Sequence, residues 1–172
     1  MEHKRNIWNP GLLSGLVLGA ISIIYFVATQ KCSIGIVNFI LWMLKLGGCI
    51  LFLRFAMLRF AKTEDGIANS DTFKMGLVAA VSSAILFSAF YLAYMLYIDP
   101  DAISNAINTA LEQYEDVISE DVLEQFEAIA PRVPQIGFWA NLVYCSIFGT
   151  VLSAILSRNI PSRNPFNTPD EQ

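Results

Sequence analysis

Hydrophobic and polar positions along the chain separate into four long apolar runs joined by polar stretches. The runs cover residues 11–29, 34–53, 75–98 and 136–156. Each run is long enough for a helix to cross the hydrocarbon core of a bilayer. The first two are joined by so short a link that they form an antiparallel hairpin. The pattern predicts an all-α fold, an integral membrane four-helix bundle made of two helical hairpins.

The remaining stretches divide the single domain, residues 1–172, into polar segments. Residues 54–74 read as a polar loop, and residues 157–172 as a short flexible tail with several prolines. Residues 99–134 are an insert between the third and fourth runs, and they hold nine of the fifteen carboxylates of the chain.

Within this insert, apolar residues recur every three or four positions from Ile103 to Ile129, which is helical spacing. At about 100° per residue, an acidic face falls on the opposite side. This acidic face comprises Glu112, Asp116, Glu120, Glu124 and Glu127. Asp121 falls on the apolar side, so we expect a break near Ser119. The sequence thus predicts an external amphipathic acidic helical insert.

Two interpretations of the acidic insert stay open. In the first, its apolar side rests on the membrane bundle and its carboxylates face water, as in an ordinary surface helix. In the second, the acidic face docks a basic partner or divalent cations, because like charges spaced four residues apart repel one another and a partner would relieve that repulsion.

Composition and charge agree with a membrane protein. Hydrophobic residues make up 55% of the chain and charged residues only 15%, which is too apolar for a soluble domain. Outside the runs, eight Lys and Arg residues lie in the head, the 54–74 loop and the tail, against two on the other side. The positive-inside rule therefore places both termini in the cytoplasm and the acidic insert outside.

Small residues recur at every fourth position in three of the runs, so helix backbones can approach one another closely. These packing candidates are Gly11, Gly15 and Gly19 in the first run, Gly76, Ala80 and Ala84 in the third, and Gly149 and Ser153 in the fourth. Packing within one bundle is the simpler interpretation, and a homo-oligomeric contact on one stripe is the alternative.

Lys45 is the one ionisable side chain well inside a run, and such residues are candidates for function. Asn38 lies on the same helix face, and Asn141 is a polar residue of the fourth run. The side chain of Lys45 leans towards the start of its helix. We expect Ser, Tyr, Asn or carbonyl groups and water to satisfy it in a polar pocket. An anchor for an anionic headgroup or phosphate, and a proton-coupled role, are the alternatives.

Several kinds of chemistry are excluded by residue type. The only histidine is His3, so the membrane part has no Ser-His or Cys-His pair and no His-ligated metal. The three cysteines form no metal-type cluster, and no Gly-rich phosphate loop follows a strand. The scattered basic residues give no nucleic-acid footprint. We expect no catalytic site, no cofactor and no bound metal.

Three motifs resemble a known family. They are Tyr97-Ile98-Asp99-Pro100-Asp101 closing the third run, the Glu-rich insert, and the run from Gly149 to Leu156 before a basic tail. The chain is similar to a bacterial domain-of-unknown-function family of small four-span inner-membrane proteins. The resemblance implies a location in the inner membrane, no assigned activity, and a link to polyprenyl-phosphate glycosyl transfer in the envelope.

The function expected from these features is that of a non-enzymatic accessory or scaffold protein of the cell envelope. It would bind a protein partner or a lipid through the acidic insert, with membrane lipids around it and a homo-oligomer as an option. A small transporter or channel is the alternative, for which Lys45, Asn38 and Asn141 would line the path. A subunit associated with polyprenyl-phosphate glycosyl transfer and a lipid-modifying enzyme are further alternatives.

Overall fold

The computed structural model describes residues 6–32, 34–63, 68–113, 125 and 128–160. All regular structure in these residues is helical, and none of them forms a strand. The long helices are α1 (Trp8–Lys31), α2 (Gly35–Thr63), α3 (Asn69–Ala93) and α6 (Val133–Arg158). Three shorter elements are the π-helical turn η1 (Tyr94–Ile98), which extends α3, α4 (Ala102–Gln113) and the 3₁₀ turn η2 (Ala130–Arg132).

Local sequence explains where these helices begin and end. Pro10 and Pro134 lie in the first turns of α1 and α6, where a backbone N–H has no partner inside the helix. At the end of α1, Cys32 adopts an extended conformation and its N–H donates to the Thr29 carbonyl at 3.3 Å. The chain then turns at once into α2, which confirms the close spacing of the first two helices.

The stretch 54–74, expected to be a loop, is mostly helical. Helix α2 continues to Thr63 and α3 begins at Asn69. Helical spacing persists beyond the apolar run, because Leu53, Met57 and Phe60 are buried while the basic residues between them are exposed. A polar residue every few positions ends an apolar run but not an amphipathic helix, so the expectation of a loop was wrong for most of this stretch.

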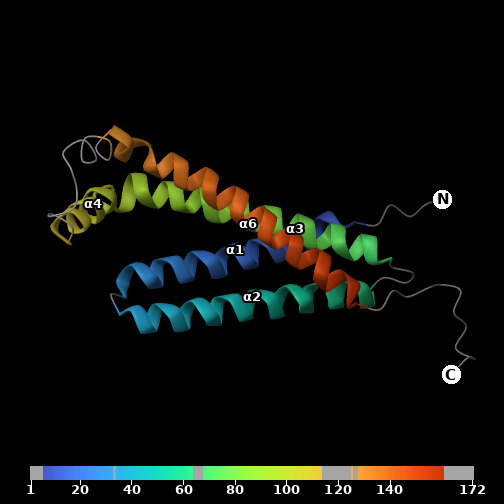
Figure 1. Ribbon diagram of the computed structural model, residues 1–172. Coiled ribbons are helices and arrows are strands. Elements are labelled where there is room, and N and C mark those ends of the chain that lie inside the picture. Colours follow the sequence, from blue (N-terminus) through green and yellow to red (C-terminus); the bar gives the residue numbers. More distant parts are fainter. Residues whose placement is uncertain (1–5, 33, 64–67, 114–124, 126–127, 161–172) are drawn as a thin grey trace, which may run out of the picture.

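Helix α3 is the centre of the assembly, with α1 and α6 packed along it and α2 packed mainly against α1 (Figure 1). The core lies in the half of the bundle nearer the termini. It is built around Leu18, Leu53, Met57, Met75 and Leu156. All the buried residues of α2 lie from Leu53 onward, so the first half of this helix is peripheral.

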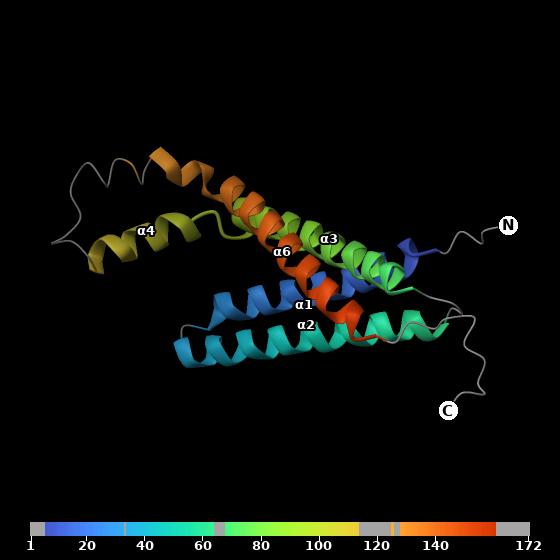
Figure 2. The same cartoon turned by 45° about the vertical axis from the view of Figure 1, so that its right-hand side comes forward.

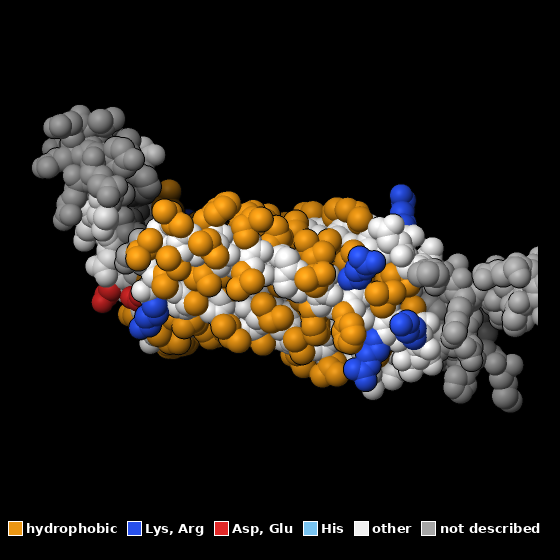
Figure 3. Space-filling model, turned by 90° about the horizontal axis from the view of Figure 1, so that it is seen from below, with side chains coloured by type: hydrophobic (Ala, Val, Ile, Leu, Met, Phe, Trp, Pro, Cys, Tyr) orange, Lys and Arg blue, Asp and Glu red, His pale blue; other side chains and the backbone are white. Residues whose placement is uncertain are grey.

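Four helices are long and apolar enough to span a membrane, as in a multi-pass membrane protein. They have 24 to 30 residues, or roughly 36 to 45 Å at 1.5 Å per residue, against a hydrocarbon core of about 30 Å. The face in Figure 3 is covered by hydrophobic side chains along its middle, and Lys and Arg side chains gather towards one end. Such a continuous apolar surface would be unusual for a soluble monomer.

The longest described element of the acidic insert is α4, which extends beyond the end of the bundle opposite the two termini (Figure 2). Asp99 and Asp101 lie between η1 and α4, and the Asn105 N–H donates to the Asp101 carbonyl at 2.8 Å. Most of the predicted acidic face lies outside the part of the chain that the structure describes. Asp116, Glu120, Glu124 and Glu127, and the expected break near Ser119, lie outside the described residues, and Glu112 is described only as part of the α4 backbone.

Candidate functional site

A cleft opens between α2 and α6, with α1 and α3 behind it, and its volume is about 340 Å³. This size is within the range of ligand pockets. The cleft exists because α2 packs against α1 and scarcely touches α6. Its lining residues are Leu18, Ser22, Trp42, Lys45, Leu46, Cys49, Leu53, Ala80, Ser83, Tyr144, Cys145, Phe148, Gly149 and Leu152.

Lys45 is the one charged residue of this lining. Its Nζ lies 4.9 Å from the centre of the Tyr25 ring of α1 and 5.6 Å from the centre of the Phe87 ring of α3. Both distances are typical of cation–π interactions, which contribute about 0.5 to 2 kcal/mol each. The lysine therefore connects α2 to the two helices behind it through aromatic ring faces.

The surroundings of the lysine differ in part from the sequence-based expectation of Ser, Tyr, Asn or carbonyl groups and water. Ser22, Ser83 and Tyr144 line the same cleft, and the faces of the Tyr25 and Phe87 rings lie against the ammonium. In the described part of the chain, the Lys45 ammonium forms no hydrogen bond and no ion pair. An ammonium has three N–H donors, so its hydrogen-bonding capacity is unused by these residues.

The ring of Phe87 is held by an aromatic cluster around Phe26 of α1. The centre of the Phe26 ring lies 5.1 to 6.4 Å from four rings of α3 and η1, at steep interplanar angles. These rings belong to Phe87, Phe90, Tyr91 and Tyr94. Edge-to-face pairs of this kind contribute beyond simple burial. The cluster fixes α1 against α3 at the level where Lys45 arrives.

The structure does not bring Asn38 or Asn141 to Lys45. The Asn38 Nδ2 donates to the Cys32 carbonyl at 2.9 Å, so this side chain closes the turn between α1 and α2. Its Oδ1 is buried without a hydrogen-bond partner among the described residues. Asn141 is half-buried in α6 and does not line the cleft. The shared pocket expected for these three residues is therefore not what the described residues form.

The glycines of the first helix face α3. A Cβ added at Gly11 would lie 2.8 Å from the Val78 Cβ, and one added at Gly19 would lie 2.7 Å from the Leu86 Cδ2. At Gly15 the added atom would meet the Ser82 Oγ and lie 2.7 Å from the Ala79 carbonyl oxygen. Three successive glycines thus meet residues that recur at every fourth position of α3.

A second line of close approach joins α3 to α6. A Cβ at Gly149 would lie 2.5 Å from the Ala80 Cβ, and one at Gly76 would lie 2.8 Å from the Ser153 Oγ. Ala84 and Ser153 are fully buried at 1% and 0% exposure. The pairs Gly76–Ser153 and Ala80–Gly149 show that α3 and α6 are antiparallel. Continued by two more turns, the same pairing brings Asn141 of α6 to the level of Ser88 of α3, on the face where the two helices pack.

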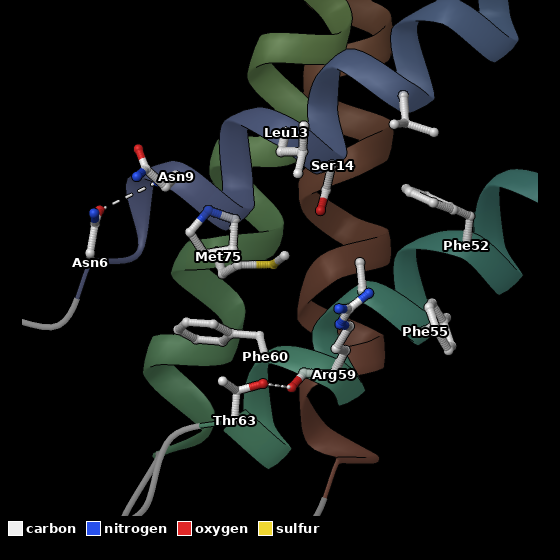
Figure 4. A pocket seen from close by; sticks show the side chains of 13 residues that line it. Asn6, Asn9, Leu13, Ser14, Phe52, Phe55, Arg59, Phe60, Thr63 and Met75 are labelled. Carbon is white, nitrogen blue, oxygen red and sulfur yellow. Dashed lines mark hydrogen bonds between the residues drawn. The ribbon is translucent and has the colours of Figure 1, made fainter.

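A second cavity, of about 500 Å³, lies between α1 and α2 at the end of the bundle that holds the termini. In Figure 4, Arg59 and Thr63 of α2 and Asn6 and Asn9 near the start of α1 surround its mouth, with Phe52 and Leu13 further in. The Thr63 hydroxyl donates to the Arg59 carbonyl at 2.8 Å, and the Asn9 N–H donates to the Asn6 Oδ1 at 3.4 Å. The Thr63 hydroxyl and the Asn6 Oδ1 are thus engaged with backbone groups of nearby residues.

Metal chemistry finds no support in the described residues, which contain no group of three or more His, Cys, Asp or Glu side chains that could hold an ion. Cys49 and Cys145 both line the cleft, and all three cysteines are free thiols. The expectation that the protein has no catalytic site stays a prediction.

Sequence reasoning found Lys45 but missed its neighbours. Tyr25 and Phe87 belong to apolar runs, and nothing in their spacing separates them from residues that face lipid. The aromatic residues Trp42 and Tyr144 also line the cleft, although they come from helices that are far apart in the sequence. The one feature that could have pointed to Tyr25 is its residue type, since it is the single tyrosine in the first helix.

Comparison with known proteins gives a family and no characterised relative. The chain matches no curated protein and no solved structure. The family described as "Protein of unknown function (DUF4199)" matches residues 10–158, which include all four long helices except the first two residues of α1, and the acidic insert between the last two. The chain therefore belongs to the DUF4199 family, an uncharacterised family.

Proposed function

We propose that the protein is a non-enzymatic accessory or scaffold protein of the bacterial inner membrane. Its external acidic segment, residues 99–134, binds a protein partner or a lipid. The observation that supports this most directly is the position of α4, which extends past the end of the four-helix bundle instead of lying along it (Figures 1 and 2). A helix in that position presents its surface to molecules outside the bundle.

Charge segregation supports the proposed orientation. The exposed basic residues near the ends of α2 and α6 and the start of α3 lie at the end that holds the termini. They are Arg59, Lys62, Lys74 and Arg158. By the positive-inside rule this end is cytoplasmic, and the acidic segment is then on the outer face of the membrane.

The spacing of the carboxylates favours binding of a basic partner by this segment. Four acids follow one another at intervals of four residues, and each like-charge pair at that spacing destabilises a helix by about 0.2 to 0.5 kcal/mol. A cationic surface that approaches the acids removes this repulsion and adds its own attraction, which is strongest at low salt. Binding and helix formation would therefore reinforce each other.

The test is co-purification from native membranes in mild detergent, comparing two variants that lose the same number of carboxylates. The test variant carries Glu112→Gln, Asp116→Asn, Glu120→Gln and Glu124→Gln. The control carries Glu64→Gln, Asp65→Asn, Asp170→Asn and Glu171→Gln, on the proposed cytoplasmic side. We expect a stoichiometric partner with the wild type and the control, and its loss with the test variant. Equal recovery with all three proteins would refute the role of the acidic segment.

A small transporter is the second candidate, and the cleft between α2 and α6 is the observation that favours it. A path between helices with one charged residue, Lys45, could admit an amphiphile. The discriminating measurement is flux or lipid movement in proteoliposomes that contain the purified protein. Movement above that of protein-free vesicles, abolished by Lys45→Met, would favour transport, and its absence would favour the scaffold.

A further inference from the structure

The cleft between α2 and α6 has a polar end and an apolar end. Trp42, Lys45 and Tyr144 lie towards the end of the bundle that is opposite the termini, and Leu53 and Leu152 lie towards the core. From Trp42 to Leu53 the cleft follows α2 for eleven residues, or about 16 Å at 1.5 Å per residue. A lysine flanked by Trp and Tyr is the composition that membrane proteins have at headgroup level.

The cleft opens sideways, on the apolar surface of the bundle. Its outer walls are exposed, with 45% of Trp42, 67% of Tyr144 and 42% of Phe148 accessible. The first half of α2, which forms one wall of the cleft, has no buried residue. A molecule that enters the cleft from the bilayer crosses only hydrophobic surface before it meets Lys45.

The Lys45 ammonium lies closer to the headgroups than its own backbone does. Its Nζ lies against the ring of Tyr25, six residues or about 9 Å before the end of α1, and the ring of Phe87, eleven residues or about 16 Å before the end of η1. The Lys45 backbone is ten residues from the start of α2, or about 15 Å. The side chain thus leans towards the nearer membrane surface, as expected for a lysine that snorkels.

We propose that this cleft binds one acyl chain of an anionic phospholipid, with the lipid phosphate on the Lys45 ammonium between Trp42 and Tyr144. The charge is complementary, since no described carboxylate pairs with Lys45. The apolar part of the cleft, lined by Leu46, Leu53 and other hydrophobic residues, receives the chain. The site is separate from the acidic segment, so the proposed scaffold role and this site can each fail without the other.

Other occupants fit less well. A transmembrane helix of a partner would place apolar side chains against an ammonium that lacks a counter-charge, which is costly in a bilayer. A second copy of this chain, docked by a two-fold axis at the cleft, would bring a second Lys45 towards the first. A lipid phosphate instead forms the charge-assisted hydrogen bonds that a lysine can donate.

Native mass spectrometry of the purified protein tests the proposal, with phosphatidylglycerol as the anionic probe and phosphatidylcholine as the neutral one. We expect the wild type to retain one phosphatidylglycerol molecule in preference to phosphatidylcholine. Lys45→Met should lower that retention about tenfold, because a charge-assisted interaction is lost. Lys45→Arg should keep it. The matched control is Lys62→Met, an exposed lysine at the other end of the bundle.

A second variant keeps the test decisive if Lys45→Met does not fold. Cys145→Phe leaves the lysine in place and narrows the cleft beside it, so it should also lower phosphatidylglycerol retention. Unchanged retention in either variant overturns the proposal. The proposal is also overturned if the protein retains the two phospholipids equally or binds a free fatty acid in their place. It is overturned as well if a second copy of the chain occupies the cleft, seen as a dimer that Lys45→Met does not dissociate.

Discussion

Gly149→Ala is the sharpest test of the packing of α6 on α3, because it adds one methyl group at the closest approach of two helices. The new Cβ would lie 2.5 Å from the Ala80 Cβ and 3.4 Å from the Ala80 Cα. Carbon atoms in contact prefer about 3.5 to 4.0 Å. The neighbouring atoms cannot rotate away, since alanine has no rotamers, so α6 has to move away from α3 by on the order of 1 Å.

Overpacking of this kind costs about 1 to 3 kcal/mol. For a chain of this size, 1 kcal/mol shifts the unfolding midpoint by roughly 2 to 4 °C, so we expect a decrease of about 2 to 12 °C. The matched control is Gly48→Ala in α2, where nothing lies within 4 Å of the added Cβ. Replacing glycine by alanine inside a helix is intrinsically favourable, so the control should keep or raise the midpoint.

The assay is thermal unfolding in detergent, followed by loss of the monodisperse peak in size-exclusion chromatography. Ala80→Gly in the Gly149→Ala background removes the opposing methyl group and should recover most of the lost midpoint. If Gly149→Ala is no less stable than Gly48→Ala, α6 does not approach α3 as described. If Ala80→Gly fails to compensate, the destabilisation has another cause.

Three further predictions follow from other parts of the molecule. In a cysteine-free background, Asp116→Cys should react with an impermeant thiol reagent on intact cells and Arg163→Cys should not; the reverse pattern refutes the proposed topology. Tyr25→Leu should destabilise the wild type more than it destabilises the Lys45→Met variant, because the cation–π interaction is already absent in that variant. The difference between the two free-energy changes should be about 0.5 to 2 kcal/mol, and additive effects would exclude the interaction. Phe26→Leu removes four edge-to-face contacts and should destabilise the protein by about 2 to 4 kcal/mol, measured in the same assay, whereas a change below 0.5 kcal/mol would show that the cluster does not hold α1 on α3.

The number and apolar character of the long helices could be predicted from the sequence, because crossing a bilayer requires only a continuous apolar stretch of sufficient length. A run of about twenty apolar residues can be recognised without knowing which helices pack against it, and four such runs correspond to α1, α2, α3 and α6. The extent of α2 was harder to predict. Its last ten residues are amphipathic, and hydropathy alone does not distinguish an exposed polar face from a polar loop.

Which helices pack against each other could be predicted from the sequence only in part. Small residues at Gly15 and Gly149 indicated faces for close packing, but not which helix each face meets. The structure pairs the first face with α3 and the second with the other side of α3, so this helix has two packed sides. The surroundings of Lys45 depend on that three-helix arrangement, and no local pattern around Tyr25 or Phe87 specifies it.

The way in which Lys45 is held explains how one residue can serve both the fold and a ligand. A lysine within a membrane helix costs up to about 2.5 to 3.5 kcal/mol on insertion scales, the value that applies at the helix centre. Two ring faces at 4.9 and 5.6 Å offset a large part of that cost without neutralising the charge. A carboxylate partner would have cancelled the charge and left nothing for an anion to recognise. Aromatic rings stabilise the ammonium from behind, and the N–H donors that do not face the rings remain available to a phosphate. The fold therefore tolerates Lys45 by a means that preserves its positive charge for the cleft.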